Sequence, residues 1–171
     1  MRSPLITTGL ITALFVLGPM VADAGSISGT VTLWGDPQGG QFIEVSAHSD
    51  PNGPPDQSVV IGVSGGGYNM ALPDGSYYVV AVFDRDGLQQ APHRDDIVAW
   101  YDSNGEGEKD TVNAGTLNGI DIDIGQVDAD IDATGNDDGS TWGNAYNDLN
   151  TALTNTPPGV ELWVAEGTYY P

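Results

Sequence analysis

Cysteine is absent from this chain of 171 residues, and basic side chains are scarce. Without cysteine the protein has no disulfide bonds, no thiolate metal ligands and no cysteine nucleophile. Only four Lys and Arg residues oppose 24 Asp and Glu residues, which gives a formal net charge of −20. Such a charge repels the phosphates of nucleic acids and of anionic membranes, so we expect neither as a partner.

The acidic excess is compatible with two roles. Clustered carboxylates supply the oxygen ligands that calcium prefers, so calcium is the one cofactor that the composition favours. Alternatively, the charge only keeps an exported protein dispersed in water. The sequence leaves both readings open.

Long apolar runs are also missing, except at the N-terminus. A single early charge, Arg2, precedes an apolar stretch from Leu5 to Val21, and Ala22-Asp23-Ala24 then provides a small-x-small cleavage pattern. This arrangement predicts a signal peptide over residues 1–24, cleaved after Ala24, and a secreted, extracellular protein. A membrane anchor is the alternative, but interruptions such as Pro19 make a poor spanning helix, and we expect no membrane span after cleavage.

The pattern of residues 25–125 predicts several short β-strands. Apolar side chains alternate with polar or solvent-facing ones in five runs, as expected for half-buried strands. The apolar positions of these runs are Ile27, Val31 and Leu33; Ile43, Val45 and Ala47; Tyr77, Val79, Ala81 and Phe83; Ile97, Ala99 and Tyr101; and Ile120, Ile122 and Ile124. With tight turns such as Pro73-Asp74-Gly75 between them, they predict a mainly β fold with an antiparallel β-sandwich over residues 25–125.

A run from Pro73 to Val79, Pro-Asp-Gly-Ser-Tyr-Tyr-Val, follows Gly29-Thr30-Val31 and Val45-Ser46-Ala47. Together these segments resemble carboxypeptidase-regulatory-like, transthyretin-like β-sandwiches, in which a P-x-G-x-Y turn leads into a core strand. The resemblance covers most of residues 26–125. It implies an accessory module without catalysis, because most members of that family play such a role.

Residues 126–171 have a different pattern. One apolar helical face is predicted from Trp142 to Leu153, with Ser140 or Thr141 as its N-cap, and a strand follows from Val160 to Ala165. The segment resembles the N-terminal cap and first rung of right-handed parallel β-helix, pectin-lyase-like proteins. Since a solenoid needs about three or more repeats to bury its core, the sequence predicts a truncated β-helix opening segment with one capping α-helix. A short strand that docks back onto the sandwich is the alternative.

Two sequence patterns suggest catalysis or zinc without the context that either needs. Gly62-Val63-Ser64-Gly65-Gly66 matches the G-x-S-x-G nucleophile pattern, but no helix is predicted after the serine, so we interpret the match as a loop. The two histidines, His48 and His93, do not supply the three or four ligands of a zinc site, and both are interpreted as surface residues.

Loop carboxylates are the best candidates for a metal site. The candidate calcium ligands, which need not belong to one site, are Asp84, Asp86, Asp95, Asp96, Asp102 and Asn104. If the strands that end at Asp84 and begin near Asp96 are antiparallel neighbours, these two ends share one sheet edge and Asp102 lies at the opposite edge. A second acidic group, which includes Asp128 and Asp130, is interpreted as the wet face of a strand. Solvated acidic turns are the alternative for the first group, and calcium across the junction between the two segments is the weaker alternative for the second.

The sequence therefore predicts a secreted, non-catalytic accessory or adhesion-type module that binds calcium, a polysaccharide or a cell-surface partner. Trp34, Trp100, Tyr101 and Tyr68 are candidates for an aromatic sugar platform, although strand aromatics are more often core residues. Two alternatives remain. The chain is the N-terminal fragment of a pectate-lyase-like, polysaccharide-active β-helix enzyme, or it is a structural spacer. No catalytic residue is predicted.

Overall fold

The computed structural model describes residues 24–35, 39–85, 92 and 96–170. The fold is mainly β. The described strands are β1 (Ala24–Trp34), β2 (Phe42–His48), β3 (Gln57–Ile61), β4 (Gly65–Pro73), β5 (Gly75–Asp84), β6 (Ile97–Trp100), β7 (Thr111–Ala114), β8 (Thr116–Leu117), β9 (Ile122–Ala129) and β10 (Glu161–Val164). A 3-10 helix, η1 (Trp142–Asn144), and one α-helix, α1 (Leu149–Asn155), lie between β9 and β10.

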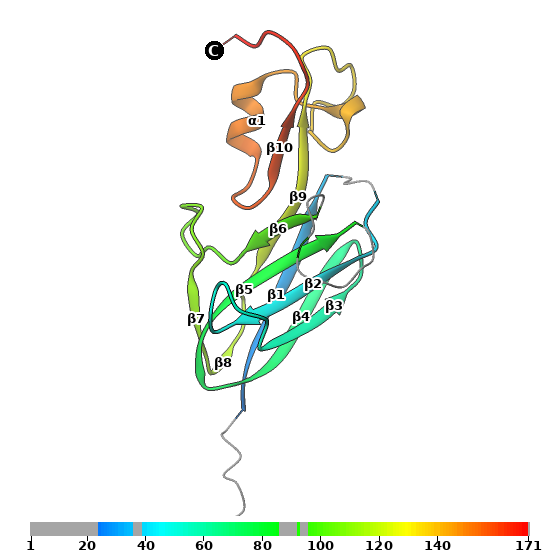
Figure 1. Ribbon diagram of the computed structural model, residues 1–171. Helices are drawn as coiled ribbons and strands as arrows, with labels where there is room; N and C mark the ends of the chain where they lie inside the picture. The colour runs from blue at the N-terminus through cyan, green and yellow to red at the C-terminus, as the bar shows by residue number, and fades with distance from the viewer. Residues whose placement is uncertain (1–23, 36–38, 86–91, 93–95, 171) are drawn as a thin grey trace, which may run out of the picture.

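The strands form two five-stranded sheets (Figure 1). The first sheet has the order β10-β9-β1-β4, with β8 pairing with β1. The second has the order β3-β2-β5-β6, with β7 pairing with β5. Figure 1 shows β9 running out of the body of the molecule toward the end where α1 and β10 lie.

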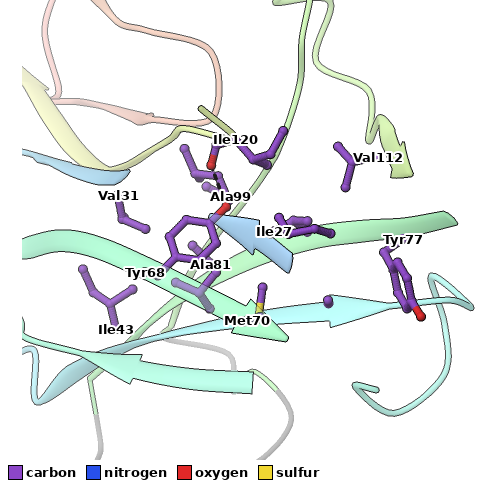
Figure 2. Packing of buried hydrophobic residues seen from close by; sticks show 14 of the residues in the cluster. Ile27, Val31, Ile43, Tyr68, Met70, Tyr77, Ala81, Ala99, Val112 and Ile120 are labelled. Carbon is purple, nitrogen blue, oxygen red and sulfur yellow. Dashed lines mark hydrogen bonds between the residues drawn. The ribbon is translucent and has the colours of Figure 1, made fainter. Parts of the chain in front are cut away.

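The apolar face of each sheet contributes to one shared core (Figure 2). Ile27 of β1 and Met70 of β4 belong to the same buried cluster as Ile43 of β2, Ala81 of β5 and Ala99 of β6. Full burial of one aliphatic side chain of this size is worth about 1.5–3 kcal/mol. The alternation predicted for all five runs is confirmed, because their inward positions are buried or, for Leu33 and Tyr101, packed against the cluster.

The expectation of a purely antiparallel arrangement is wrong for one strand. β1 pairs antiparallel with β4, but it pairs parallel with both β8 and β9. The reason is topological: the chain passes through the whole second sheet before β8 and β9 return to β1. A long return of this kind permits a parallel approach, which a tight hairpin does not.

The helix predicted from Trp142 is shorter than expected and begins later. Trp142–Asn144 form only a 3-10 turn, with the Thr141 hydroxyl accepting from the Asn144 amide. The backbone of Tyr146 then bonds to β9, since its amide donates to the Asp128 carbonyl and its carbonyl accepts from the Asp130 amide. Because these groups are used in a parallel bridge, the helix begins only at Leu149.

The strand β9 crosses residue 125, where the sequence divides into its two predicted segments. Its first half, from Ile122, pairs with β1, while Gln126–Ala129 pair parallel with Glu161–Val164 of β10. One continuous strand therefore joins the core of the two sheets to the C-terminal elements. In the part of the chain that is described, no helix has the length and apolarity needed to cross a membrane.

Candidate functional site

The predicted calcium ligands fall at two separate ends of β6. β5 and β6 are antiparallel neighbours, with Phe83 opposite Ile97, so Asp84 and Asp96 lie at one shared edge as expected. Asp84 is buried, and a carboxylate oxygen of Asp96 accepts from the Arg85 amide at 3.0 Å. Asp102 follows the other end of β6. Asp86 and Asp95 lie outside the described residues.

The carboxylate of Asp102 organises its own loop. It accepts hydrogen bonds from the amides of Asn104 at 3.1 Å, Gly105 at 2.8 Å and Gly107 at 2.6 Å, while the Asn104 side-chain oxygen accepts from the Glu106 amide. Desolvation alone raises the pKa of Asp102, but these amide donors together lower that pKa below its ordinary value. Three lone-pair directions of the carboxylate therefore already point at N–H groups.

No group of three or more His, Cys, Asp or Glu side chains in the described ranges is arranged to hold a metal ion. Calcium binding by the acidic loops stays a prediction.

One member of the predicted aromatic platform is a core residue. Tyr68 is 5% exposed, and its hydroxyl donates to the Ile120 carbonyl at 2.5 Å (Figure 2), so this part of the prediction is wrong. Trp34 is on the surface and its indole N–H donates to Asp123. The Lys109 ammonium lies 5.4 Å from the centre of the Trp100 ring.

A different pair of tryptophans lines a cavity of about 370 Å³ near the junction between the sheets and the C-terminal elements. Trp142 is 43% exposed and Trp163 is 40% exposed. We call this space the tryptophan cavity. It is lined by Arg85, Gln126, Asp128, Thr141, Trp142, Gly143 and Trp163.

Parallel pairing of β9 and β10 places the side chains of this cavity. Gln126 is opposite Glu161 and Asp128 is opposite Trp163. Since alternate residues of a strand share one face, these four side chains lie together on one face of the pair. Trp142 enters from η1, and Arg85 follows β5 of the second sheet. The cavity therefore draws on both sheets and on η1.

A chain of polar contacts crosses the cavity wall. The Arg85 guanidinium donates through Nη2 to Gln126 Oε1 at 3.3 Å, and Gln126 Nε2 donates to Asp128 Oδ1 at 2.6 Å. Gln126 and Asp128 are both buried. Because Gln126 accepts from an arginine and donates to a carboxylate, the orientation of its amide is defined by its neighbours.

Burial sets the electrostatics of this chain. Desolvation raises the pKa of Asp128 above its ordinary value, and the hydrogen bond from Gln126 opposes that shift. The Arg85 guanidinium carbon lies 5.6 Å from the centre of the Trp163 ring, in cation–π range. Its Nε atom is buried without a hydrogen-bond partner among the described residues. A buried donor of this kind marks a place where water or a ligand atom is needed.

Sequence reasoning missed this cavity. Trp142 was predicted as part of a helix face and Trp163 as part of a strand, while Asp128 was predicted to lie on a wet face and is only 4% exposed. The available signal was weak: Gln126 and Asp128 alternate on one strand, and Arg85 is one of four basic residues. Nothing local in the sequence joins Arg85 to residues more than 40 positions away.

The two catalytic or zinc-like patterns also have defined places. Ser64 lies in the turn between β3 and β4 and is followed by a strand, as its interpretation as a loop predicts. His93 lies outside the described residues. His48 ends β2, where it is half-buried and bonded to Ser46 and to the Gly53 carbonyl. It lies on the face of β2 that points away from the core, as its interpretation as a solvent-side residue predicts.

No protein-family model, curated protein or solved structure matches this chain. The resemblances to transthyretin-like sandwiches and to pectin-lyase-like β-helices stay predictions. The tryptophan cavity is the part of the structure that suggests a function.

Proposed function

We propose that this protein is a secreted accessory module that binds polysaccharide in the tryptophan cavity, without catalysis at that site. The observation that carries the proposal is that two partly exposed tryptophans, Trp142 and Trp163, share one cavity with a hydrogen-bonded chain of Arg85 and the buried Gln126 and Asp128. Its extracellular location rests on the predicted signal peptide over residues 1–24.

The two kinds of side chain match the two kinds of sugar surface. A pyranose ring presents C–H groups on its faces, and these pack on the flat apolar face of an indole ring. Its hydroxyl groups both donate and accept hydrogen bonds, so they need partners of both types. Asp128 is an acceptor and Arg85 is a donor with an Nε–H that lacks a partner in the described structure. A cavity that is mostly apolar with a few convergent polar groups is typical of a binding site.

The charge of the site favours a neutral glycan. Asp128 lines the cavity and opposes the positive charge of Arg85, and the whole chain carries a net charge of −20. Long-range repulsion would weaken the approach of a polyanion, and more strongly at low ionic strength. A neutral polysaccharide meets no such barrier.

The test is affinity electrophoresis of the full chain in gels that contain neutral or acidic polysaccharides, followed by calorimetry with oligosaccharides of the retarding glycan. We expect Trp163→Ala to weaken binding about fivefold or more, since truncation of one well-packed aromatic anchor typically removes more than 1 kcal/mol. Trp34→Ala is the matched control, because Trp34 is 38% exposed but does not line the tryptophan cavity. Equal retardation of wild type and Trp163→Ala by every glycan, or no retardation at all, contradicts the proposal.

We also propose a more specific architecture. The two sheets form a transthyretin-like sandwich, and β9 and β10 are successive turns of a right-handed parallel β-helix. The in-register parallel pairing of Gln126–Ala129 with Glu161–Val164, with α1 between the strands, supports the second part. The intact mass of the secreted product from its native host tests it. A product much heavier than residues 25–171 supports a longer solenoid and favours a polysaccharide-active enzyme as the whole protein. A product with the mass of residues 25–171 argues against the longer solenoid and against that enzyme.

A further inference from the structure

A second cavity, of about 510 Å³, lies on the face of the β3-β2-β5-β6 sheet that points away from the core. Val45 and Ala47 of β2 face the core, so Ser46 and His48 face this cavity by the alternation of a strand. Val80, Val82 and Val98 line the same cavity. Its floor is therefore apolar, and its polar groups come from β2, from the loop that follows it and from Lys109.

Two of those polar groups are a serine and a histidine in hydrogen-bond contact. Ser46 Oγ lies 2.8 Å from His48 Nε2, and His48 Nδ1 lies 3.1 Å from the Gly53 carbonyl oxygen. A carbonyl oxygen only accepts, so in the neutral imidazole the proton is on Nδ1 and the lone pair is on Nε2. The serine hydroxyl then donates to Nε2. This arrangement has the same hydrogen-bond roles as the serine and histidine of a catalytic triad, with a backbone carbonyl in the place of the orienting carboxylate.

The loop from residue 49 to residue 56 holds the orienting carbonyl in place. The Gly53 amide donates to the Asp50 carbonyl at 3.0 Å, and the Asp56 amide donates to the Ala47 carbonyl at 2.8 Å. The Ser49 amide donates to the Asp56 carboxylate at 2.5 Å. The loop therefore closes on the end of β2 by several bonds, and the histidine ring is held between this loop and Ser46.

From this geometry we propose a second activity, independent of polysaccharide binding: Ser46 is a nucleophile and His48 its general base in the hydrolysis of carboxylic esters with a small apolar acyl group. Ser46 is directly opposite Val80 in the sheet, so an acyl chain bound on the valines lies beside Oγ. Asn52 and Lys109 also line the cavity and carry N–H donors of the kind that stabilise the negative charge on an ester oxygen during attack.

The reaction is balanced with water as the only co-reactant. Ser46 Oγ forms a bond to the acyl carbon while its proton moves to His48 Nε2, and the ester C–O bond breaks as that proton passes to the departing alcohol. Water then attacks the acyl-serine, gives a proton to Nε2, and releases the carboxylic acid. The proton returns from Nε2 to Ser46 Oγ.

The test combines covalent labelling with turnover. The full chain is treated with a fluorophosphonate, digested and examined by mass spectrometry, and release of p-nitrophenol from p-nitrophenyl butyrate is followed in parallel. We expect the adduct on Ser46, its loss in Ser46→Ala, and a decrease of at least 100-fold in hydrolysis by Ser46→Ala and by His48→Gln, in line with the usual contribution of a general base. Ser64→Ala is the matched control and should keep both labelling and turnover.

Three results would overturn the proposal: no adduct on Ser46 of the folded wild type, hydrolysis that survives Ser46→Ala, or an adduct on Ser64 in its place. Circular dichroism establishes that each variant is folded. If a variant fails to fold, the position of the adduct in the wild-type chain still decides. Neither labelling nor turnover depends on Trp142 or Trp163, so the outcome is separable from that of the polysaccharide experiment.

Discussion

Replacing Gly29 by alanine is expected to be severely destabilising. Gly29 lies in the middle of β1, opposite Tyr68 of β4. A β-carbon built on it would lie 2.5 Å from the carbonyl carbon of Ile120, and closer still to its oxygen. Non-bonded heavy atoms rest at about 3.5 Å or more, so the segment at Ile120 would have to move by roughly 1 Å.

The segment at Ile120 is not free to move. Its amide donates to the Ser28 carbonyl at 3.1 Å, and its carbonyl accepts from the buried Tyr68 hydroxyl at 2.5 Å. Overpacking in a close-packed core typically costs about 1–3 kcal/mol, and a buried hydroxyl that loses its partner costs about 1–3 kcal/mol more. We therefore expect Gly29→Ala to lower the free energy of unfolding by roughly 2–6 kcal/mol.

Urea denaturation followed by tryptophan fluorescence and by circular dichroism measures this difference. The matched control is Gly67→Ala, one position before Tyr68 on β4, where the nearest atom to an added β-carbon is the Gly29 carbonyl oxygen at 3.9 Å. We expect that control to be neutral or to stabilise by about 0.5–1 kcal/mol, since glycine is a poor strand residue. If the free energies of unfolding of Gly29→Ala and Gly67→Ala differ by less than 1 kcal/mol, the predicted clash between the new β-carbon and Ile120 is refuted.

Three further predictions follow from named contacts. Tyr68→Phe removes the hydrogen bond to Ile120 while keeping the ring, so it should lower the free energy of unfolding by about 1–2 kcal/mol in the same urea assay; an unchanged value contradicts the buried bond. Burial raises the pKa of Asp128, so the stability of the wild type falls as the pH rises through that pKa. Asp128→Asn should therefore be more stable than the wild type at neutral pH and show no gain at low pH. Thermal melts from pH 2 to 8 measure this difference, with a substitution of the exposed Asp132, Asp132→Asn, as control. Asp148 caps α1 by accepting a hydrogen bond from the Thr151 amide at 2.7 Å, and hydrogen bonds from Thr151 lower the pKa of Asp148. Asp148→Ala should therefore speed amide hydrogen exchange in α1 above pH 4. Equal exchange rates in the two proteins would count against the cap.

Local patterns in the sequence were sufficient for β1, β2, β5, β6 and β9, whereas β3, β4, β7 and β8 lie outside the five predicted alternating runs. The inward positions predicted from alternation, such as Ile43, Val79 and Ile124, are fully buried. This success has a physical reason: a half-buried strand records its two faces in successive residues, and a sheet that covers one core buries every second one. The helix was placed less well, because the hydrogen bonds of Tyr146 to β9 override the apolar periodicity that begins at Trp142.

The candidate sites were much less accessible to sequence reasoning. The G-x-S-x-G serine, Ser64, lies at a turn, whereas the serine in contact with a histidine is Ser46, in a strand with no recognised motif. Strand alternation places Ser46 and His48 on one face. It says nothing of the loop that brings the Gly53 carbonyl to the imidazole.

The sequence by itself determined the composition, the strong negative charge, the predicted export signal and the two-faced strands, because each of these is a property of single residues or of near neighbours. Only the tertiary structure decided that β9 runs parallel to β1 and that β10 joins β9. The pairing of β9 with β10 sets Asp128 opposite Trp163, and the second sheet adds Arg85 to the same cavity. Their contacts span more than 30 residues of chain, and such contacts depend on how sheets pack rather than on any local periodicity.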